Sequence, residues 1–563
     1  MESASPHHSL PPLGPAERRS EPKQAGPPAR REAGRNRERG RFLASAALLV
    51  LSYAFRLPAL VNARATNSDA SIVGLQAMHI LRGEVSPFLW GSGYQTSADA
   101  FWAAAFFAIT GPSPLALMLS SLTLHVVATW LVFATLRRRF SPWTSLAIVM
   151  PLIVAPASIH TYALYPPRQL GITLAVATFT ALTAARRSPH PHVLLAAGGA
   201  LYGFAVSADP YPMVLAPVVL VYTLLVIHDR RINPAFGGLL RRVASPALGT
   251  LVGLVPFLLL RRIANATSGQ MGLSSGVVRH NWDLLIRECL PWALSYRVYH
   301  APIAANYRPW EAPIPVQAVQ LAGALTVAGL IVLAFISARK ASIPQSIRHL
   351  GLVGALTFPV TIAAFLVSVM VMDHFSMRYL AVLTSMLPFA AVPAAYLLGR
   401  SRFIALMTPH LIASALCGWL GYGPFVRGIT PVVDPSLRDD DALLALAEER
   451  GITYAQADYW ASYRLTLLFA ERLIVVPTNP SEDRYPPYRR AFEAAPRFAY
   501  LYDPGRSREN LDEVEQKLRA ANPSVEKTNA GAHTVFIVTR ASSAADGEQQ
   551  EPTREAPAER VDD

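Results

Sequence analysis

The stretch NSDASIVGLQAMHILRGEVSPFLWGSGYQTSADAFWAAAFFAITGPSP, residues 67–114, decides how the rest of the chain is read. It is too polar to sit in lipid, yet the segments on both sides of it are apolar enough to cross a membrane. Asp69 and Asp99 each open a run that has apolar residues at helical spacing. This pattern predicts two amphipathic helices along a membrane surface, each with an acid at its N-terminal end.

The two acids have a structural explanation as well as a functional one. Acidic side chains near the start of a helix are stabilised by the helix dipole, so capping alone would account for either Asp69 or Asp99. Asp69, however, comes directly after a membrane span and heads an amphipathic helix. We therefore keep both acids as candidate site residues.

The composition indicates a membrane protein. Of the 563 residues, 52% are hydrophobic and only 16% are charged, whereas soluble proteins carry about 25% charged residues. The net charge of +13 is concentrated in clusters between apolar runs, so it reports topology rather than a nucleic-acid partner. The two cysteines, Cys289 and Cys417, imply neither a disulfide framework nor a thiolate metal site.

Eleven membrane spans are predicted from the apolar runs. The basic tail that precedes them, residues 1–41, carries nine Lys or Arg residues and is expected to be disordered and cytoplasmic. With the N-terminus inside, the cytoplasmic connections all carry Lys or Arg and the short outer connections carry one Arg or none, as the positive-inside rule requires. The predicted spans are 42–60, 115–135, 143–160, 168–185, 192–207, 211–227, 244–260, 316–338, 350–371, 378–399 and 403–420.

The predicted fold class is an α-helical polytopic membrane protein with a small extracytoplasmic α/β domain at its C-terminus. The transmembrane domain covers residues 42–420 and contains a first outer loop, 61–114, and a second large outer loop, 261–315. Residues 421–540 alternate short strands and helices, which is typical of a small α/β domain. Residues 541–563 are expected to be disordered.

Aromatic side chains are frequent in the second outer loop. They are expected at a membrane interface, the interpretation that we favour, and they also suit stacking on a sugar. The residues are Trp282, Trp292, Tyr296, Tyr299, Tyr307 and Trp310.

Candidate polar residues gather on the outer side of the predicted membrane domain. The chain has no nucleotide-binding glycine loop, Walker lysine, HExxH, GxSxG or CxxC motif, so neither ATP-driven transport nor a familiar soluble hydrolase is supported. An aqueous cavity that opens outward would solvate the polar residues at the outer ends of spans, whereas Asp209 is explained well enough by its turn. These residues are Asp69, Asp99, Arg168, Asp209, Asp373, His374 and Arg378.

The first outer loop resembles that of the GT-C membrane glycosyltransferases, in the branch with protein O-mannosyltransferases, aminoarabinose transferases and Rgt-like bacterial enzymes (glycosyltransferase family 39-like). The stretch MRYLAVLTSMLP, 377–388, is similar to the opening of a late span in these enzymes, and YAQADYWASYRLTLLFAERLIVVPTNPSEDRYPPY, 454–488, looks like a segment of uncharacterised bacterial members. Ala70 stands in place of the second acid of the family's acidic pair, and Thr96 in place of a glycine. The matching positions are Asp69, Ala77, Ile80, Leu81, Gly83, Glu84, Pro87, Gly91, Tyr94, Ser97, Asp99, Ala100, Gly111, Pro112 and Ser113.

The resemblance implies transfer of a sugar from a polyprenyl-phosphate donor to a lipid, glycan or protein acceptor at the outer face of a bacterial inner membrane. Asp69 would be the general base that deprotonates the acceptor hydroxyl, and Asp99 would orient its neighbours or the acceptor. Because Ala70 replaces the second acid, a metal role for such a pair is in doubt; a divalent metal remains open as a cofactor. Arg378, and second Arg168, would bind the donor phosphate, since a guanidinium matches phosphate oxygens. His374 and Tyr94 would assist in substrate binding, and Tyr485, Tyr488 and Arg484 suit either contacts to the acceptor or turns.

Two other functions remain open. A transporter or flippase for lipid-linked sugars would show discontinuous spans and charges near the bilayer midplane, whereas the charges here lie at the outer rim. A non-catalytic assembly protein of the same fold is the other alternative, and the Ala70 departure keeps it open. The sequence does not name the sugar, the acceptor or the oligomeric state.

Overall fold

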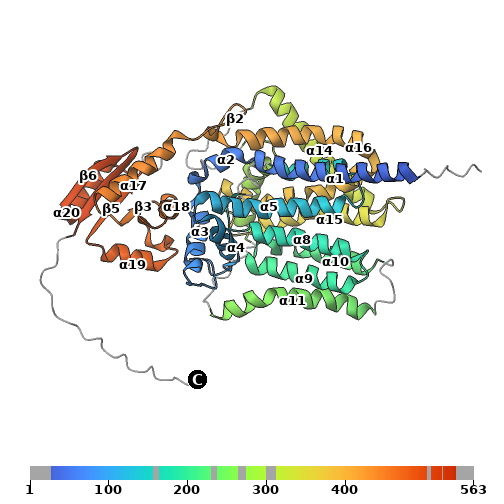
Figure 1. The fold of residues 1–563 in the computed structure, drawn as a ribbon, viewed down its shortest axis with the longest axis horizontal. Coiled ribbons are helices and arrows are strands. Elements are labelled where there is room, and N and C mark those ends of the chain that lie inside the picture. Colours follow the sequence, from blue (N-terminus) through green and yellow to red (C-terminus); the bar gives the residue numbers. More distant parts are fainter. Residues whose placement is uncertain are drawn as a thin grey trace, which may run out of the picture.

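The structure is a computed structural model, and it describes residues 27–155, 164–229, 238–263, 274–298, 312–503, 509–522 and 524–540. A bundle of apolar helices forms the larger part, and a small domain with a β-sheet lies at one end of it (Figure 1). The predicted fold class is therefore confirmed.

Each predicted span overlaps a helix of the described residues, and the end of the predicted span 143–160 lies outside them. Within the described residues, six helices are long and apolar enough to cross a membrane, and four further apolar helices are shorter, so the count of eleven stays a prediction. Gly399, with φ of 70°, interrupts the last long helix at the expected boundary between two spans. The bundle helices are α1 (Pro27–Ala54), α2 (Leu57–Val61), α5 (Pro114–Leu136), α6 (Pro142–Ile153), α8 (Gln169–Ala185), α9 (Pro191–Ala208), α10 (Ala216–Ile227), α11 (Leu239–Ile263), α14 (Ile314–Ala338), α15 (Gln345–Val367) and α16 (Ala381–Leu420).

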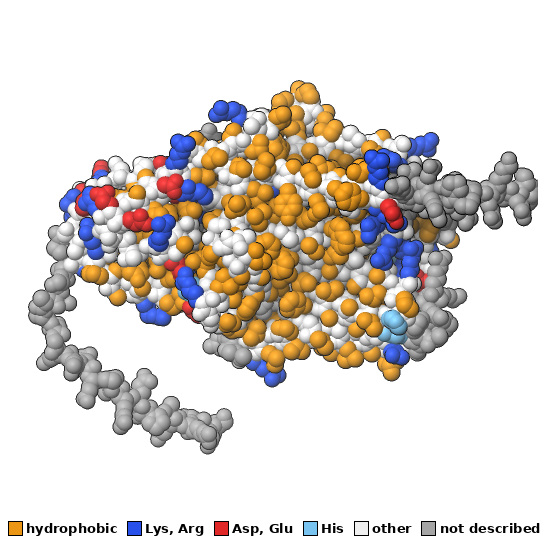
Figure 2. All heavy atoms as spheres, viewed as in Figure 1, with side chains coloured by type: hydrophobic (Ala, Val, Ile, Leu, Met, Phe, Trp, Pro, Cys, Tyr) orange, Lys and Arg blue, Asp and Glu red, His pale blue; other side chains and the backbone are white. Residues whose placement is uncertain are grey.

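The surface of the bundle has the pattern of a protein that spans a membrane. Figure 2 shows apolar side chains spread over the flank of the bundle, with Lys and Arg side chains gathered at the end far from the small domain. Charged side chains of both signs cover the small domain itself. Apolar flanks bounded by charged ends are expected when hydrocarbon covers the middle and water covers both ends.

The first outer loop forms two helices, α3 (Ser68–Leu81) and α4 (Ala98–Thr110), and α3 runs across the end of the bundle (Figure 1). Nearly every α3 residue is buried, because the bundle lies on one side and the small domain on the other. A Cβ added at Gly74 would lie 2.9 Å from Leu467 of the small domain and 3.2 Å from Leu117 of α5. The sequence predicted a helix along a membrane surface, but the small domain covers this one.

The small domain is built on a mixed sheet of five strands in the order β4-β3-β5-β7-β6. Strand β3 pairs in parallel with β4 and β5, whereas β7 is antiparallel to β5 and β6. The sequence predicts helices over 443–452 and 509–522 and strands over 471–477, 497–504 and 533–540, which correspond to α17, α20, β4, β5 and β7, whereas β3, β6, α18 and α19 were missed. The elements are α17 (Asp439–Glu449), β3 (Tyr454–Ala457), α18 (Tyr459–Leu468), β4 (Ile474–Pro477), α19 (Pro486–Ala494), β5 (Arg497–Tyr502), α20 (Leu511–Ala521), β6 (Ser524–Ala530) and β7 (His533–Thr539).

Candidate functional site

Asp69 does not cap its own helix. That role belongs to Asn67, whose side-chain oxygen accepts a hydrogen bond of 2.9 Å from the backbone N–H of Ala70. The Asp69 carboxylate instead accepts a hydrogen bond from the hydroxyl of Tyr459, at 2.5 Å between Tyr459 Oη and Asp69 Oδ1. Tyr459 is the first residue of α18, so a side chain of the small domain reaches the acid of the first outer loop.

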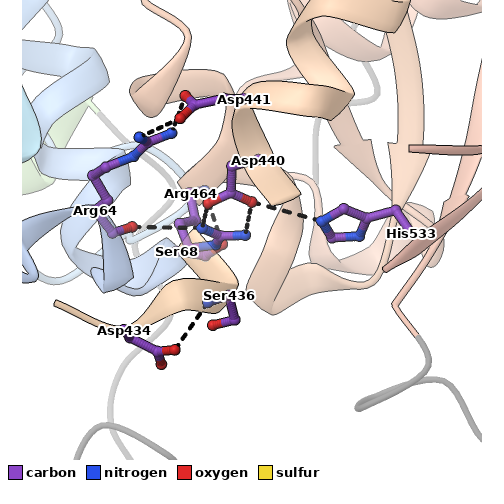
Figure 3. Close-up of polar contacts among 8 residues, drawn as sticks. All are labelled: Arg64, Ser68, Asp434, Ser436, Asp440, Asp441, Arg464 and His533. Atoms are coloured by element: carbon purple, nitrogen blue, oxygen red, sulfur yellow. Dashed lines mark hydrogen bonds and ion pairs between the residues drawn. The ribbon is translucent and has the colours of Figure 1, made fainter. Parts of the chain in front are cut away.

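A buried polar network positions the start of α18 against α3 (Figure 3). Ser68 Oγ donates to the backbone carbonyl of Tyr459 at 2.5 Å and accepts from the backbone N–H of Arg464 at 3.3 Å. The Arg464 guanidinium forms two bonds of 2.8 and 3.0 Å with Asp440, whose other neighbour is His533 Nε2 at 3.7 Å. Burial opposes the Asp440 charge, but His533 and Arg464 outweigh burial and lower the pKa of Asp440 to about 2.

Arg484 adds a positive charge to the same corner. Its guanidinium lies 5.5 Å from the Tyr459 ring centroid, and its Nη1 donates to the carbonyl of Gly91 at 2.9 Å. Burial alone would lower the pKa of Arg484, but the Tyr459 phenol and the Asp69 carboxylate raise it above the usual value. Burial and the charge of Asp69 likewise raise the pKa of Tyr459, so the phenol keeps its proton and acts as a donor.

Tyr94 lies in the loop between α3 and α4. Its loop is held by Gln76, whose Nε2 donates to the carbonyl of Phe88 at 3.0 Å and to Ser97 Oγ at 2.9 Å. Burial raises the pKa of Tyr94; Arg168 opposes that rise, while Asp209 and Asp69 add to it. The Tyr94 phenol therefore keeps its proton and can act as a hydrogen-bond donor.

Arg168 is the centre of a second group of charged side chains. It adopts φ of 99°, a left-handed conformation that costs an ordinary side chain about 1–3 kcal/mol and is often found at functional sites. Its Nε lies 3.5 Å from Asp209 Oδ2, and the same carboxylate oxygen accepts a bond of 3.1 Å from Gln95. The turn role predicted for Asp209 is confirmed, since its Oδ1 accepts a bond of 2.9 Å from the backbone N–H of Tyr211, and the other oxygen of this buried carboxylate lies beside Arg168.

The Tyr379 ring brings Arg378 close to Arg168. The guanidinium carbon of Arg378 lies 5.3 Å from the centroid of the Tyr379 ring, and that of Arg168 lies 5.1 Å from the same centroid. Tyr379 belongs to the short helix η6 (His374–Leu380), and its backbone carbonyl accepts a bond of 2.9 Å from the Tyr211 hydroxyl. The two predicted phosphate-binding arginines therefore flank one aromatic ring, although their positions in the sequence are 210 residues apart.

Asp99 contacts the backbone at Arg168. It is 5% exposed, and its Oδ2 lies 3.5 Å from the backbone N–H of Arg168, just before α8. Burial and the charge of Asp209 raise the pKa of Asp99 to about 7, against the opposing backbone N–H groups of Arg168 and Leu170. Asp99 is therefore placed to hold the segment that presents Arg168.

Two predicted substrate contacts lie in other clusters. His374 Nδ1 is 3.8 Å from Glu288, and its ring packs on Trp292 at 5.5 Å between centroids. The Tyr485 ring stacks on Trp90 at 4.0 Å, and its hydroxyl donates to Glu84 at 2.7 Å. Both side chains have structural partners, and their roles in substrate binding stay predictions.

The second outer loop is described only in part. Trp282 is 54% exposed, Trp292 is buried and Tyr296 is partly buried, so exposure to water or lipid differs among these aromatics. Tyr299, Tyr307 and Trp310 lie outside the described residues. Among the described residues, His, Cys, Asp and Glu side chains form no group of three or more that could hold a metal ion.

Sequence reasoning missed Tyr459 as a site residue, although it lies within the quoted segment YAQADYWASYRL. It also missed Tyr379, which lies in the quoted MRYL motif, and gave Arg484 only an acceptor-contact or turn role. A signal was present in residues 454–488, where five of 35 residues are tyrosine and three are arginine. Pairing them with Asp69 and Arg168 needed the three-dimensional fold.

No protein-family model matches the chain, and no curated protein sequence matches it. The fold is similar to that of ArnT. For the crystal structure of ArnT from Cupriavidus metallidurans bound to undecaprenyl phosphate, the TM-score is 0.47 at 12% identity, with 90% of this chain and 99% of that chain covered. For an Archaeoglobus fulgidus oligosaccharyltransferase in complex with zinc and sulfate, the TM-score is 0.44 at 10% identity, with 77% of this chain and 62% of that chain covered.

A third similar structure is the oligosaccharyltransferase AglB from Archaeoglobus fulgidus in complex with an inhibitory peptide and a dolichol-phosphate. Its TM-score is 0.40 at 11% identity, with 78% of this chain and 65% of that chain covered. The likeness to these three structures concerns the arrangement of the helices.

Proposed function

We propose that this protein is a membrane glycosyltransferase that moves a sugar from a polyprenyl-phosphate donor to an acceptor hydroxyl. The observation that carries the proposal is a carboxylate, Asp69, that accepts a hydrogen bond from Tyr459, together with two guanidinium groups, Arg168 and Arg378, over the Tyr379 ring. A carboxylate and a pair of guanidinium groups supply the base and the phosphate contacts that such a transfer needs.

The location of Asp69 and Arg168 supports a lipid-linked donor. Asp69 belongs to α3 and Arg168 directly precedes α8, where the apolar bundle meets the small polar domain (Figures 1 and 2). A polyprenyl chain stays in the hydrocarbon, whereas its phosphate and sugar need water and polar partners. A site at this boundary serves both parts of the donor at once.

The reaction needs a base, groups that stabilise the leaving phosphate and a residue that positions one of these groups. Asp69 takes the proton of the acceptor hydroxyl, and the acceptor oxygen attacks the anomeric carbon of the sugar. The bond between that carbon and the phosphate oxygen breaks, and polyprenyl phosphate leaves with the electron pair. Arg168 and Arg378 stabilise the charge that develops on the phosphate. Asp99 holds the Arg168 segment, a positioning role.

A donor panel tests the reaction class. Purified protein in nanodiscs is supplied with polyprenyl-phosphate sugars that differ in the sugar, together with bacterial membrane extract as the acceptor source. We expect release of free polyprenyl phosphate and transfer of labelled sugar to an acceptor for at least one donor. Movement of intact donor across sealed vesicles without release would instead establish a flippase.

The acceptor panel then separates the three acceptor classes. Labelled product that partitions into organic solvent is a glycolipid, product that resists protease in the aqueous phase is a glycan, and product that protease degrades is a glycoprotein. Neither donor release nor donor movement, in protein that binds polyprenyl phosphate, would point to a non-catalytic assembly protein and refute the proposal.

A further inference from the structure

The small domain contributes a side chain that contacts Asp69. The hydroxyl of Tyr459 donates to Asp69 Oδ1 at 2.5 Å, from a residue 390 positions away in the sequence. The other carboxylate oxygen, Oδ2, accepts no hydrogen bond from the described residues, and Asp69 remains partly exposed. One oxygen is thus anchored by Tyr459, and the other can face an acceptor hydroxyl.

We propose that Tyr459 is a positioning residue that orients the Asp69 carboxylate for proton abstraction, so that the small domain is part of the catalytic site. This inference rests on the proposed function, because it needs Asp69 to be the base. The arrangement follows a general rule: a catalytic base works best when a third group orients it. Here that third group comes from a separate domain.

The structure supplies the rigidity that positioning requires. Tyr459 is 9% exposed, and its backbone carbonyl is bonded to Ser68, the residue directly before Asp69. Asp458 caps α18 by accepting from the backbone N–H groups of Trp460 and Ala461. Two hydrogen bonds therefore hold Tyr459 against this part of α3: one from the side chain of Ser68 to the Tyr459 carbonyl, and one from the Tyr459 hydroxyl to Asp69. They leave little freedom between the Tyr459 and Asp69 side chains.

Arg484 completes the corner from the same domain. Its guanidinium lies 5.5 Å from the Tyr459 ring, and its backbone N–H donates to the Tyr463 hydroxyl at 2.6 Å. The approach to the first outer loop is close: a Cβ added at Gly91 would lie 2.9 Å from Arg484 Cα. Arg484 and Tyr459 thus form a fixed surface of the small domain over Asp69.

A double-mutant cycle tests the inference in the full-length protein. Tyr459→Phe removes only the hydroxyl, and we expect kcat for donor turnover to fall about 10- to 100-fold, the size of a lost hydrogen bond to a charged group. The donor KM and the melting temperature should stay at the wild-type values. Tyr454→Phe, a matched change in β3 of the same domain, should leave turnover unchanged.

The decisive comparison uses the Asp69→Asn background. If Tyr459 acts through Asp69, adding Tyr459→Phe to Asp69→Asn lowers kcat no further. Losses that multiply would overturn the inference, because Tyr459 would then act independently of Asp69. Full activity of Tyr459→Phe beside an impaired Asp69→Asn would also overturn it while leaving the proposed function intact, whereas full activity of Asp69→Asn would reject Asp69 as the base.

Discussion

Asp440 and Asp441 are neighbours in the sequence with opposite environments, and this contrast gives a quantitative prediction. Asp440 is 3% exposed and forms two bonds with the buried Arg464, whereas the Asp441 side chain is 63% exposed and pairs with Arg64 at the surface (Figure 3). Replacing Asp440 by Asn leaves the Arg464 charge buried without its carboxylate. Replacing Asp441 by Asn removes only an exposed ion pair.

The expected losses of stability follow from how deeply each ion pair is buried. Removing one partner of a buried ion pair typically costs about 3–5 kcal/mol. The pKa gives an independent figure: the fall of the Asp440 pKa from 3.8 to about 2 corresponds to about 2.5 kcal/mol. An exposed pair contributes about 0–1 kcal/mol. We therefore expect Asp440→Asn to destabilise the small domain by about 2–4 kcal/mol and Asp441→Asn by less than about 1 kcal/mol.

Thermal unfolding measures this difference. In detergent, loss of the small domain can be followed by the temperature at which a protease begins to cut it, and for a domain of this size about 1 kcal/mol shifts the midpoint by about 4 °C or more. We expect a clear downward shift for Asp440→Asn and a small one for Asp441→Asn. Equal shifts for the two variants, or a wild-type midpoint for Asp440→Asn, would refute the reasoning.

Three further predictions concern pH, helix packing and the donor. Burial lowers the pKa of His79, but the hydrogen bonds that its protonated ring donates to Glu471 and Glu84 outweigh burial and raise the pKa. The stabilisation is therefore complete below about pH 6.5 and is lost as the pH rises through the raised value; protease access to the small domain should increase over that range, and His79→Gln should abolish the change. A Cβ at Gly354 of α15 would lie 2.1 Å from the backbone N of Ala390, so Gly354→Ala should cost about 1–3 kcal/mol in thermal stability, whereas Gly329→Ala, with open space around it, should be neutral. Arg168→Gln should raise the donor KM and lower kcat for donor release by about tenfold or more each if Arg168 holds the phosphate in both the ground and transition states, and an unchanged KM would place the phosphate elsewhere.

The sequence was sufficient for the features that depend on local pattern. Apolar runs and the placement of Lys and Arg predict the helical bundle, and alternating short patterns predict the small α/β domain. Strand β3 and helix α18 were missed because four residues, YAQA, carry too little periodicity and because α18 is buried on most sides and shows no amphipathic contrast.

The site shows the same limit at the level of side chains. Asp69, Asp99, Arg168, Arg378 and Tyr94 were selected from the sequence, and the structure relates Arg168 to Arg378 through the Tyr379 ring and to Asp99 at the start of α8. The bond between Tyr459 and Asp69 spans 390 residues. Such a contact depends on how the small domain docks, and no local pattern encodes it.

The most direct measurement of the central claim is the initial rate of polyprenyl-phosphate release by wild type and Asp69→Asn, with donor binding measured on the same preparations. Loss of a general base typically costs a factor of about 10² to 10⁴. We expect a loss of that size with unchanged donor affinity. Equal release rates for the two proteins would contradict the claim that Asp69 drives a glycosyl transfer at this site.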